Sequence, residues 1–220
     1  MPAPPRPEDF RLLPYEGRGD DPPTREVGFL AAVAIVLREA SHESSRRREL
    51  ELLLIRRSTH ERDPWSGQMA LPGGRKDPED DSLLGTAIRE TREETRIDLG
   101  REARLLGRLT HVAPRARELP VLTVLPFVFE LEREVRAAPV SEEVSEVVWA
   151  PLSGLLDPGA RATHRHTTPG GESLQFPAFD VRGRIVWGMT HRILEDLLSR
   201  LTASGTSAAP GRRSGPSTPP

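Results

Sequence analysis

The sequence lacks cysteine and contains a single lysine, Lys76, among its 31 basic residues. Without cysteine, the chain has neither a disulfide framework nor a thiol nucleophile, so both kinds of chemistry are excluded. The strong preference for arginine over lysine indicates the composition of the genome rather than a particular function.

Long apolar runs are also absent. No segment approaches the length of a membrane span, and the N-terminal sequence MPAPPRPEDF has no apolar signal core. We therefore expect a cytoplasmic protein without membrane contact. The formal net charge of −2 argues against a general nucleic-acid binder, which usually has a basic surface. The 220 residues, 36% of them hydrophobic, fit one domain with a substantial core.

The two ends of the chain differ in composition from its centre. Residues 1–25 are rich in proline and charge and are predicted to form a flexible arm, with Phe10 and Tyr15 as the side chains able to touch the domain. Residues 203–220 are mostly serine, threonine, glycine, proline and alanine, which predicts a disordered tail. The folded domain is therefore expected over residues 26–202, and residues 1 to about 20 and 205–220 are expected to be dispensable.

Between the ends, apolar and β-branched runs alternate with polar stretches. Strands are predicted at 27–37, 50–55, 105–111, 121–131 and 144–149, and helices at 82–96 and 190–201. Because the strands do not alternate regularly with helices, the pattern indicates an α+β fold. The polar stretch 41–48 is expected to be a hairpin insertion. Pro126 predicts that its strand lies at an edge of the sheet or at a bulge.

The most informative segment is residues 73–97, GGRKDPEDDSLLGTAIRETREETRI. In a helix Glu90 and Glu94 stand one turn apart on the same face, with Glu93 beside them. Carboxylates this close raise one another's pKa unless a cation lies between them. Hard divalent ions such as Mg²⁺ or Mn²⁺ prefer such oxygen ligands, often together with substrate phosphates. The segment therefore predicts metal-dependent chemistry on a phosphorylated substrate.

The same helix has a second, less polar face. Residues recurring at helical spacing lie about 120° from the carboxylates: Leu84, Ala87, Ile88, Thr91 and Thr95. This division into a core face and a charged face favours a metal site. The alternative is a solvated, charged helix surface, which is common in proteins.

This segment resembles the signature of the Nudix hydrolase family. The matching positions are Gly74, Arg89, Glu90, Glu93, Glu94 and Ile97. The resemblance implies an αβα sandwich with a mixed β-sheet. It also implies that the three glutamates hold Mg²⁺ or Mn²⁺, that Arg89 orients them, and that the Gly74 backbone lies close to metal or phosphate. The signature's glycine after Glu-Glu is replaced here by Arg96.

A longer acidic loop connects the glycines to the helix. Asp77 and Asp80 in this loop, preceded by Leu-Pro-Gly-Gly, are similar to the coenzyme A pyrophosphatase branch of the family, as is the upstream run with Arg57, Arg62 and Gly67. This likeness implies cleavage of coenzyme A to 3′,5′-ADP and 4′-phosphopantetheine. The alternatives are another nucleotide substrate, such as ADP-ribose, a dinucleotide or an oxidised nucleoside triphosphate, and a non-catalytic nucleotide-binding module.

Other candidate residues lie outside the signature. Arg57 and Arg62 are predicted to bind substrate phosphate, because a guanidinium meets two phosphate oxygens at once. Glu142 and Glu143 are candidates for the general base. Three histidines are further candidates for phosphate contacts, although loop histidines are usually solvated: His111, His164 and His166. The expected partner is a small nucleotide, and the protein is expected to be a monomer or a homodimer.

Overall fold

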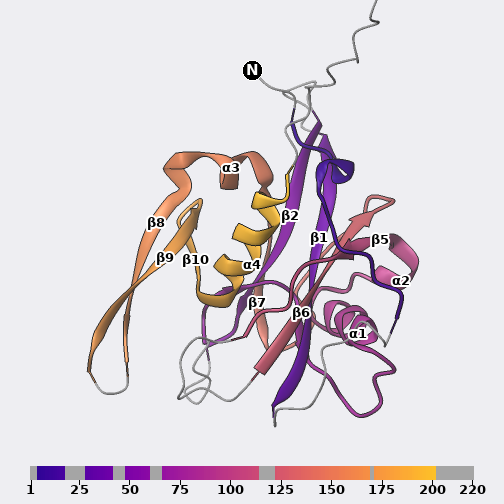
Figure 1. Cartoon of the computed structure of the whole chain (residues 1–220), viewed down its shortest axis with the longest axis horizontal. Coiled ribbons are helices and arrows are strands. Elements are labelled where there is room, and N and C mark those ends of the chain that lie inside the picture. The colour runs from indigo at the N-terminus through magenta and orange to yellow at the C-terminus, as the bar shows by residue number, and fades with distance from the viewer. Residues whose placement is uncertain are drawn as a thin grey trace, which may run out of the picture.

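The structure is a computed structural model that describes residues 4–17, 28–41, 48–59, 66–113, 122–168 and 171–201. Its main strands are β1 (Phe29–Ser41), β2 (Arg48–Arg57), β3 (Met69–Ala70), β4 (Gly73–Arg75), β5 (Ala103–Arg108), β6 (Leu122–Leu131), β7 (Val144–Pro151), β8 (Arg161–Thr167), β9 (Ser173–Val181) and β10 (Arg184–Trp187). The helices are α1 (Leu83–Thr95), α2 (Leu99–Glu102), α3 (Leu152–Leu156) and α4 (Gly188–Ser199), with 3-10 turns at Pro7–Asp9 and Pro158–Ala160 (Figure 1).

A mixed sheet of seven strands forms the centre of the molecule. Its strand order is β3-β2-β1-β6-β5, with β4 also pairing with β1 and β7 with β2. β1 runs parallel to β6 and antiparallel to β2 and β4. The predicted α+β class with a mixed sheet is therefore confirmed.

The segment 69–75 is inserted between β1 and β2. These two strands pair only at residues 37–41 and 48–52, and beyond that point they diverge. On the edges that they leave open, β3 pairs with β2 and β4 pairs with β1. A peptide hydrogen bond from Ala34 to the Pro72 carbonyl, 2.8 Å long, closes the join. The insertion brings the predicted glycine turn into the sheet itself.

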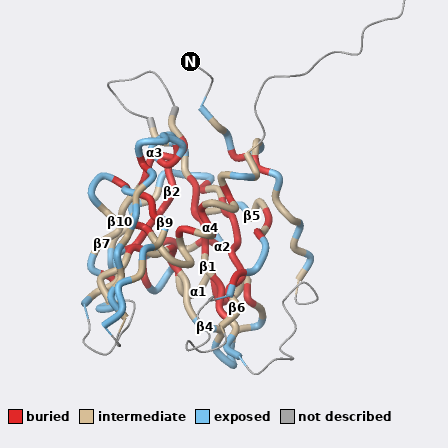
Figure 2. Tube along the Cα trace, turned by 60° about the vertical axis from the view of Figure 1, so that its left-hand side comes forward, coloured by how far each residue is buried: buried red, intermediate tan, exposed pale blue. Residues whose placement is uncertain are grey.

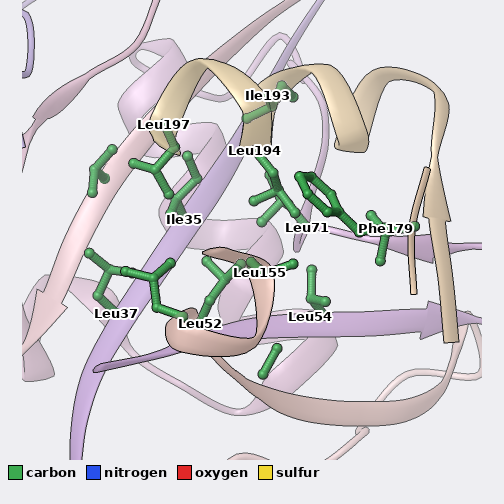
Figure 3. Packing of buried hydrophobic residues seen from close by; sticks show 14 of the residues in the cluster. Ile35, Leu37, Leu52, Leu54, Leu71, Leu155, Phe179, Ile193, Leu194 and Leu197 are labelled. Carbon is green, nitrogen blue, oxygen red and sulfur yellow. The ribbon is translucent and has the colours of Figure 1, made fainter. Parts of the chain in front are cut away.

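Two hydrophobic layers cover the two faces of the sheet. Because side chains alternate along a strand, Ile35 and Leu37 of β1 pack in the layer beneath α4, whereas Ala34 and Val36 pack in the layer beneath α1. Figure 3 shows Leu194 and other α4 side chains directed onto the first of these layers. The buried residues follow the central strands (Figure 2). The αβα sandwich is therefore confirmed.

The predicted helices and most predicted strands agree with the structure within a few residues. The helix expected at 82–96 is α1, and the one expected at 190–201 is α4. Arg96 adopts the left-handed conformation at the C-cap of α1, with φ 71°, although this region favours glycine. The hairpin insertion at 42–47 lies outside the described residues, as does the tail predicted at 203–220.

The prediction that the strand with Pro126 lies at an edge is wrong, because β6 lies between β1 and β5. The Pro126 carbonyl accepts a hydrogen bond from the Leu109 amide, 3.0 Å long. In an antiparallel pair the backbone N–H and C=O of one residue point to the same neighbouring strand. The side of Pro126 that lacks an N–H therefore faces Leu109, the residue after Arg108. β5 ends at Arg108, which makes a central proline tolerable.

A second, three-stranded sheet was not predicted. It has the order β10-β9-β8 and is joined through α3 and α4 to the main sheet. It places His164 and His166 on β8, so the expectation that these histidines lie in a loop is wrong. The alternating exposure of β8 follows the two-residue repeat of a strand, but its polar composition hid that repeat.

Part of the predicted arm packs on the domain. Phe10 is only 7% exposed and forms a β-bridge with Leu201, and Leu13 bridges to Arg108. The ring of Tyr15 meets that of Phe127 edge-on, with 4.9 Å between centroids. The expectation that the first 20 residues are dispensable therefore does not extend to residues 7–15.

None of the helices within the described residues is long and apolar enough to cross a membrane.

Removing the docked arm should destabilise the domain. We expect Phe10→Ala to lower the unfolding free energy by about 3 kcal/mol, since truncating a buried phenylalanine removes its transfer free energy and leaves a cavity. Thermal and urea unfolding of full-length protein would measure this change. The matched control is deletion of residues 206–220, which should leave the melting temperature unchanged. Equal melting temperatures for wild type and Phe10→Ala would show that the arm contact contributes nothing.

Candidate active site

A compact acidic loop leads from β4 into α1. Asp80 organises this loop: its carboxylate accepts hydrogen bonds from the Asp77 amide at 3.0 Å and from the Thr86 hydroxyl at 2.9 Å. The N-cap residue Ser82 accepts from the Gly85 amide, as N-cap serines commonly do. The loop therefore fixes the start of the helix whose face bears the glutamates.

Arg89 ties the loop to the helix. Its Nε and Nη2 donate to the two oxygens of Asp80, both at 2.9 Å. Its Nη1 lies 3.0 Å from the carboxylates of both Glu90 and Glu93. The paired hydrogen bonds with Arg89 hold the pKa of Asp80 well below its usual range, and Asp80 in turn raises the pKa of Arg89. Arg89 thus stays charged and contacts two of the three signature glutamates; its role in orienting them stays a prediction.

Glu94 is the most deeply buried of the three glutamates, with 3% of its surface exposed. Its Oε2 accepts a 2.9 Å hydrogen bond from the Gly73 amide, which connects α1 directly to the inserted segment. Burial, together with the nearby charge of Glu90, raises the pKa of Glu94 to about 8 despite the opposing effect of the Gly73 hydrogen bond.

Glu90 lies against the second glycine. A Cβ placed on Gly74 would come within 2.4 Å of Glu90 Oε1, so a side chain at this position would displace the carboxylate. Burial raises the pKa of Glu90, and Arg89 partly opposes that rise. Glycine at position 74 therefore leaves the room that the Glu90 carboxylate occupies.

Glu93 differs from the other two glutamates, because its side chain is 50% exposed and bonded to Arg89. Within the described residues, no three histidine, cysteine, aspartate or glutamate side chains are arranged as a metal site. The donors nevertheless fit a hard cation: the half-buried Glu90 and the buried Glu94 supply oxygens whose negative charges repel each other, and a divalent ion would offset that repulsion. Their assignment as ligands, with Glu93 and Gly74, stays a prediction.

Two of the residues predicted outside the signature lie at the same place. The positive charge of Arg57 acts on Glu94, and the negative charge of Glu143 acts on both Glu90 and Glu94. The Ser58 amide donates to the Glu143 carbonyl at 2.7 Å, which holds the start of β7 beside the end of β2.

The remaining candidates are placed less favourably or not described. Glu142 is exposed beside Glu143, and His111 is exposed after the end of β5. Arg62 lies outside the described residues. His164 and His166 lie on the second sheet.

Comparison with known proteins assigns the family. The family model of the NUDIX domain matches residues 28–170, which include the whole glycine, loop and helix arrangement. This chain belongs to the Nudix family. Members of this family generally use divalent metal ions, in agreement with the donors found here. The resemblance first seen in residues 73–97 is confirmed.

Curated relatives of the chain include enzymes of coenzyme A metabolism. The human protein named mitochondrial coenzyme A diphosphatase NUDT8 is 35% identical over 156 residues, covering 70% of this chain and 64% of that protein. Mouse peroxisomal coenzyme A diphosphatase NUDT7 is 32% identical over 107 residues, covering 49% of this chain and 42% of that protein. The chain thus spans less than two thirds of the length of these relatives. The expected cytoplasmic location stays a prediction.

A solved structure also resembles the fold. The MutT/nudix family protein from Enterococcus faecalis aligns with a TM-score of 0.55 at 19% identity, covering 83% of this chain and 65% of that chain. At this identity the similarity concerns the fold alone.

The buried carboxyl of Glu94 predicts a pH-dependent stability in chelator. Its folded pKa of about 8 exceeds its ordinary value of 4.5, so between these values the unfolded chain loses a proton that the folded chain keeps. Wild-type stability should therefore fall as pH rises through this window, and Glu90 contributes in the same direction.

Glu94→Gln removes the Glu94 contribution. We expect the variant to match wild type near pH 4.5 and to exceed it by on the order of a few kcal/mol above pH 8, as measured by urea unfolding. Adding Mn²⁺ at pH 8 should raise the melting temperature of wild type more than that of the variant. A stability difference independent of pH would contradict the burial of this charge.

The two glycines should respond differently to alanine. At Gly73, with φ 147°, a Cβ would lie 2.3 Å from the Ala32 carbonyl oxygen, so Gly73→Ala should lower the melting temperature markedly because backbone must move. At Gly74 the obstacle is the end of the Glu90 side chain, so Gly74→Ala should keep most of its stability and weaken Mn²⁺ binding. Scanning calorimetry would measure the melting temperatures, and titration calorimetry would measure Mn²⁺ binding. Similar behaviour of the two variants would show that Glu90 is not fixed against Gly74.

Proposed function

We propose that the protein is a metal-dependent pyrophosphohydrolase that cleaves coenzyme A or an acyl derivative to 3′,5′-ADP and 4′-phosphopantetheine. The main support is the buried Glu94 and the half-buried Glu90 that Arg89, Gly73 and Gly74 hold at the sheet, since such a pair suits a cation bound to pyrophosphate. Relatives named as coenzyme A diphosphatases support the choice of substrate.

Each residue of the site has a distinct task in this proposal. Glu90, Glu93 and Glu94 would hold Mg²⁺ or Mn²⁺, which supplies charge neutralisation at the phosphates and a more acidic water when bound. Arg89 keeps the glutamates in place through Asp80, and the Gly73 amide fixes Glu94. Arg89 is not a base, because a guanidinium does not deprotonate.

The hydrolysis needs a proton acceptor and a phosphate contact. A water oxygen bonds to one phosphorus, the anhydride P–O bond breaks, and one proton of that water passes to a base. Glu143 is the better placed of the two candidate bases, because its charge acts on Glu90 and Glu94. The charge of Arg57 acts on Glu94, and its guanidinium can pair with phosphate oxygens.

Cleavage of coenzyme A with Mg²⁺ or Mn²⁺ tests the proposal, with products identified by mass. We expect turnover by wild type, none in chelator, and a loss of at least about 100-fold in kcat for Glu94→Gln, since one lost transition-state contact commonly costs several kcal/mol. The matched control is Glu134→Gln on an exposed loop, which should be neutral. Comparing Glu143→Gln with Glu142→Gln separates the candidate bases.

Substrate choice is tested with the same assay. Arg57→Ala should raise KM more for coenzyme A than for its dephospho form if Arg57 contacts the 3′-phosphate. Turnover of ADP-ribose, a dinucleotide or an oxidised nucleoside triphosphate without cleavage of coenzyme A would favour another Nudix substrate. Nucleotide binding without any turnover would favour a non-catalytic module.

A further inference from the structure

A cleft lies between the end of the main sheet and the second sheet. Its volume is about 430 Å³, which is within the usual range for small-molecule sites. The residues that shape it are Arg56, Gln68, Met69, His164, His166 and Trp187. The proposed metal ligands take no part in its lining, so the mechanism described above leaves it without a role.

Aromatic rings form one wall of this cleft. The ring of Trp187 lies 4.3 Å from that of His164 and 5.0 Å from that of His166, with interplanar angles of 31° and 34°. The ring centroid of Phe176 lies 5.4 Å from that of Trp187, but Phe176 does not line the cleft. These rings come from three strands, so the second sheet gathers them on one face.

The wall is only partly buried. His164, His166 and Trp187 are each half-buried, whereas the Phe179 ring beneath α4 is fully buried in the core. Burial and the neighbouring His166 lower the pKa of His164, which favours its neutral imidazole. The cleft therefore offers partly exposed, flat ring surfaces on one wall, with the Arg56 side chain also in its lining.

The cleft adjoins the glutamates through two short stretches of chain. Arg56 lines the cleft, while the next residue, Arg57, acts on Glu94 from the α1 side, as expected of neighbours on a strand. Met69 lines the cleft, and Gly73, four residues later, donates to Glu94. Four extended residues span roughly 13 Å, so one nucleotide could reach from the cleft to the glutamates around this end of the sheet.

We propose that this cleft binds the adenine base of the substrate against the Trp187 and His164 rings, and so selects adenine nucleotides for the carboxylate site. The inference rests on the proposed function, because it assumes a substrate with a nucleotide half and a pantetheine half. A planar base is the better occupant of the two, since aromatic walls bind bases by stacking, whereas a pantetheine chain has no ring face to present.

Binding of the separate product halves tests the inference directly. Calorimetry on the full chain would measure 3′,5′-ADP and 4′-phosphopantetheine with wild type, Trp187→Leu and His164→Leu. We expect Trp187→Leu to weaken 3′,5′-ADP binding by about 5- to 100-fold, the range that loss of one stacking ring causes. Binding of 4′-phosphopantetheine should not change. Trp187→Phe, which keeps a ring, should restore most of the affinity.

Phe176→Leu is the matched control, because it removes a ring from the same cluster without removing a lining residue. It should bind 3′,5′-ADP as wild type does, and circular dichroism should show that all variants fold. Wild-type affinity for 3′,5′-ADP in both Trp187→Leu and His164→Leu would overturn the inference. So would a loss confined to 4′-phosphopantetheine, an equal loss in Phe176→Leu, or no binding of 3′,5′-ADP by wild type.

The test of the adenine site can fail or succeed independently of the test of the proposed function. Ring-dependent binding of 3′,5′-ADP without cleavage of coenzyme A would support the adenine site and remove coenzyme A as substrate. Cleavage of coenzyme A with an unchanged KM in Trp187→Leu would remove the adenine site and leave the function intact.

Discussion

The site depends on how closely one short segment approaches its neighbours. Residues 69–75 fill the gap where β1 and β2 diverge, and this places the Gly73 backbone against Ala32 and the Gly74 backbone against the Glu90 carboxylate. Only residues without a side chain allow both approaches. The same segment presents its Gly73 amide to Glu94, so the position of the glutamate-bearing face of α1 relative to the sheet follows from this packing.

The packing has an electrostatic consequence. It places the half-buried Glu90 carboxylate close to the buried Glu94 carboxylate, and the loss of solvation together with their mutual repulsion raises the pKa of both groups. Arg89 offsets only part of this effect because it is also engaged by Asp80. A divalent cation would offset the rest, which explains why a stable fold can retain an arrangement that is unfavourable by itself.

The second sheet extends the same end of the molecule. Its aromatic wall stands on the other side of β2 and β3 from the glutamates, and the adjacent residues Arg56 and Arg57 face the two regions. A substrate with two chemically different halves suits such an arrangement, since reaction and recognition can be separated along its length. The docked arm, through Phe10 and Tyr15, supports the opposite side of the domain.

The sequence by itself determined the family, the α+β class, the helix 83–95 and the residues on its charged face, because helical spacing and glycine placement are local properties. Tertiary structure alone decided three other features. The central position of β6 comes from its pairing with both β1 and β5, and the wall around Trp187 joins three strands, of which β8 has a polar composition that hides its repeat. The place of Glu143 beside the end of β2 comes from the β2–β7 pairing. Each of these features depends on contacts between segments that are far apart in the sequence, and local residue spacing does not predict such contacts.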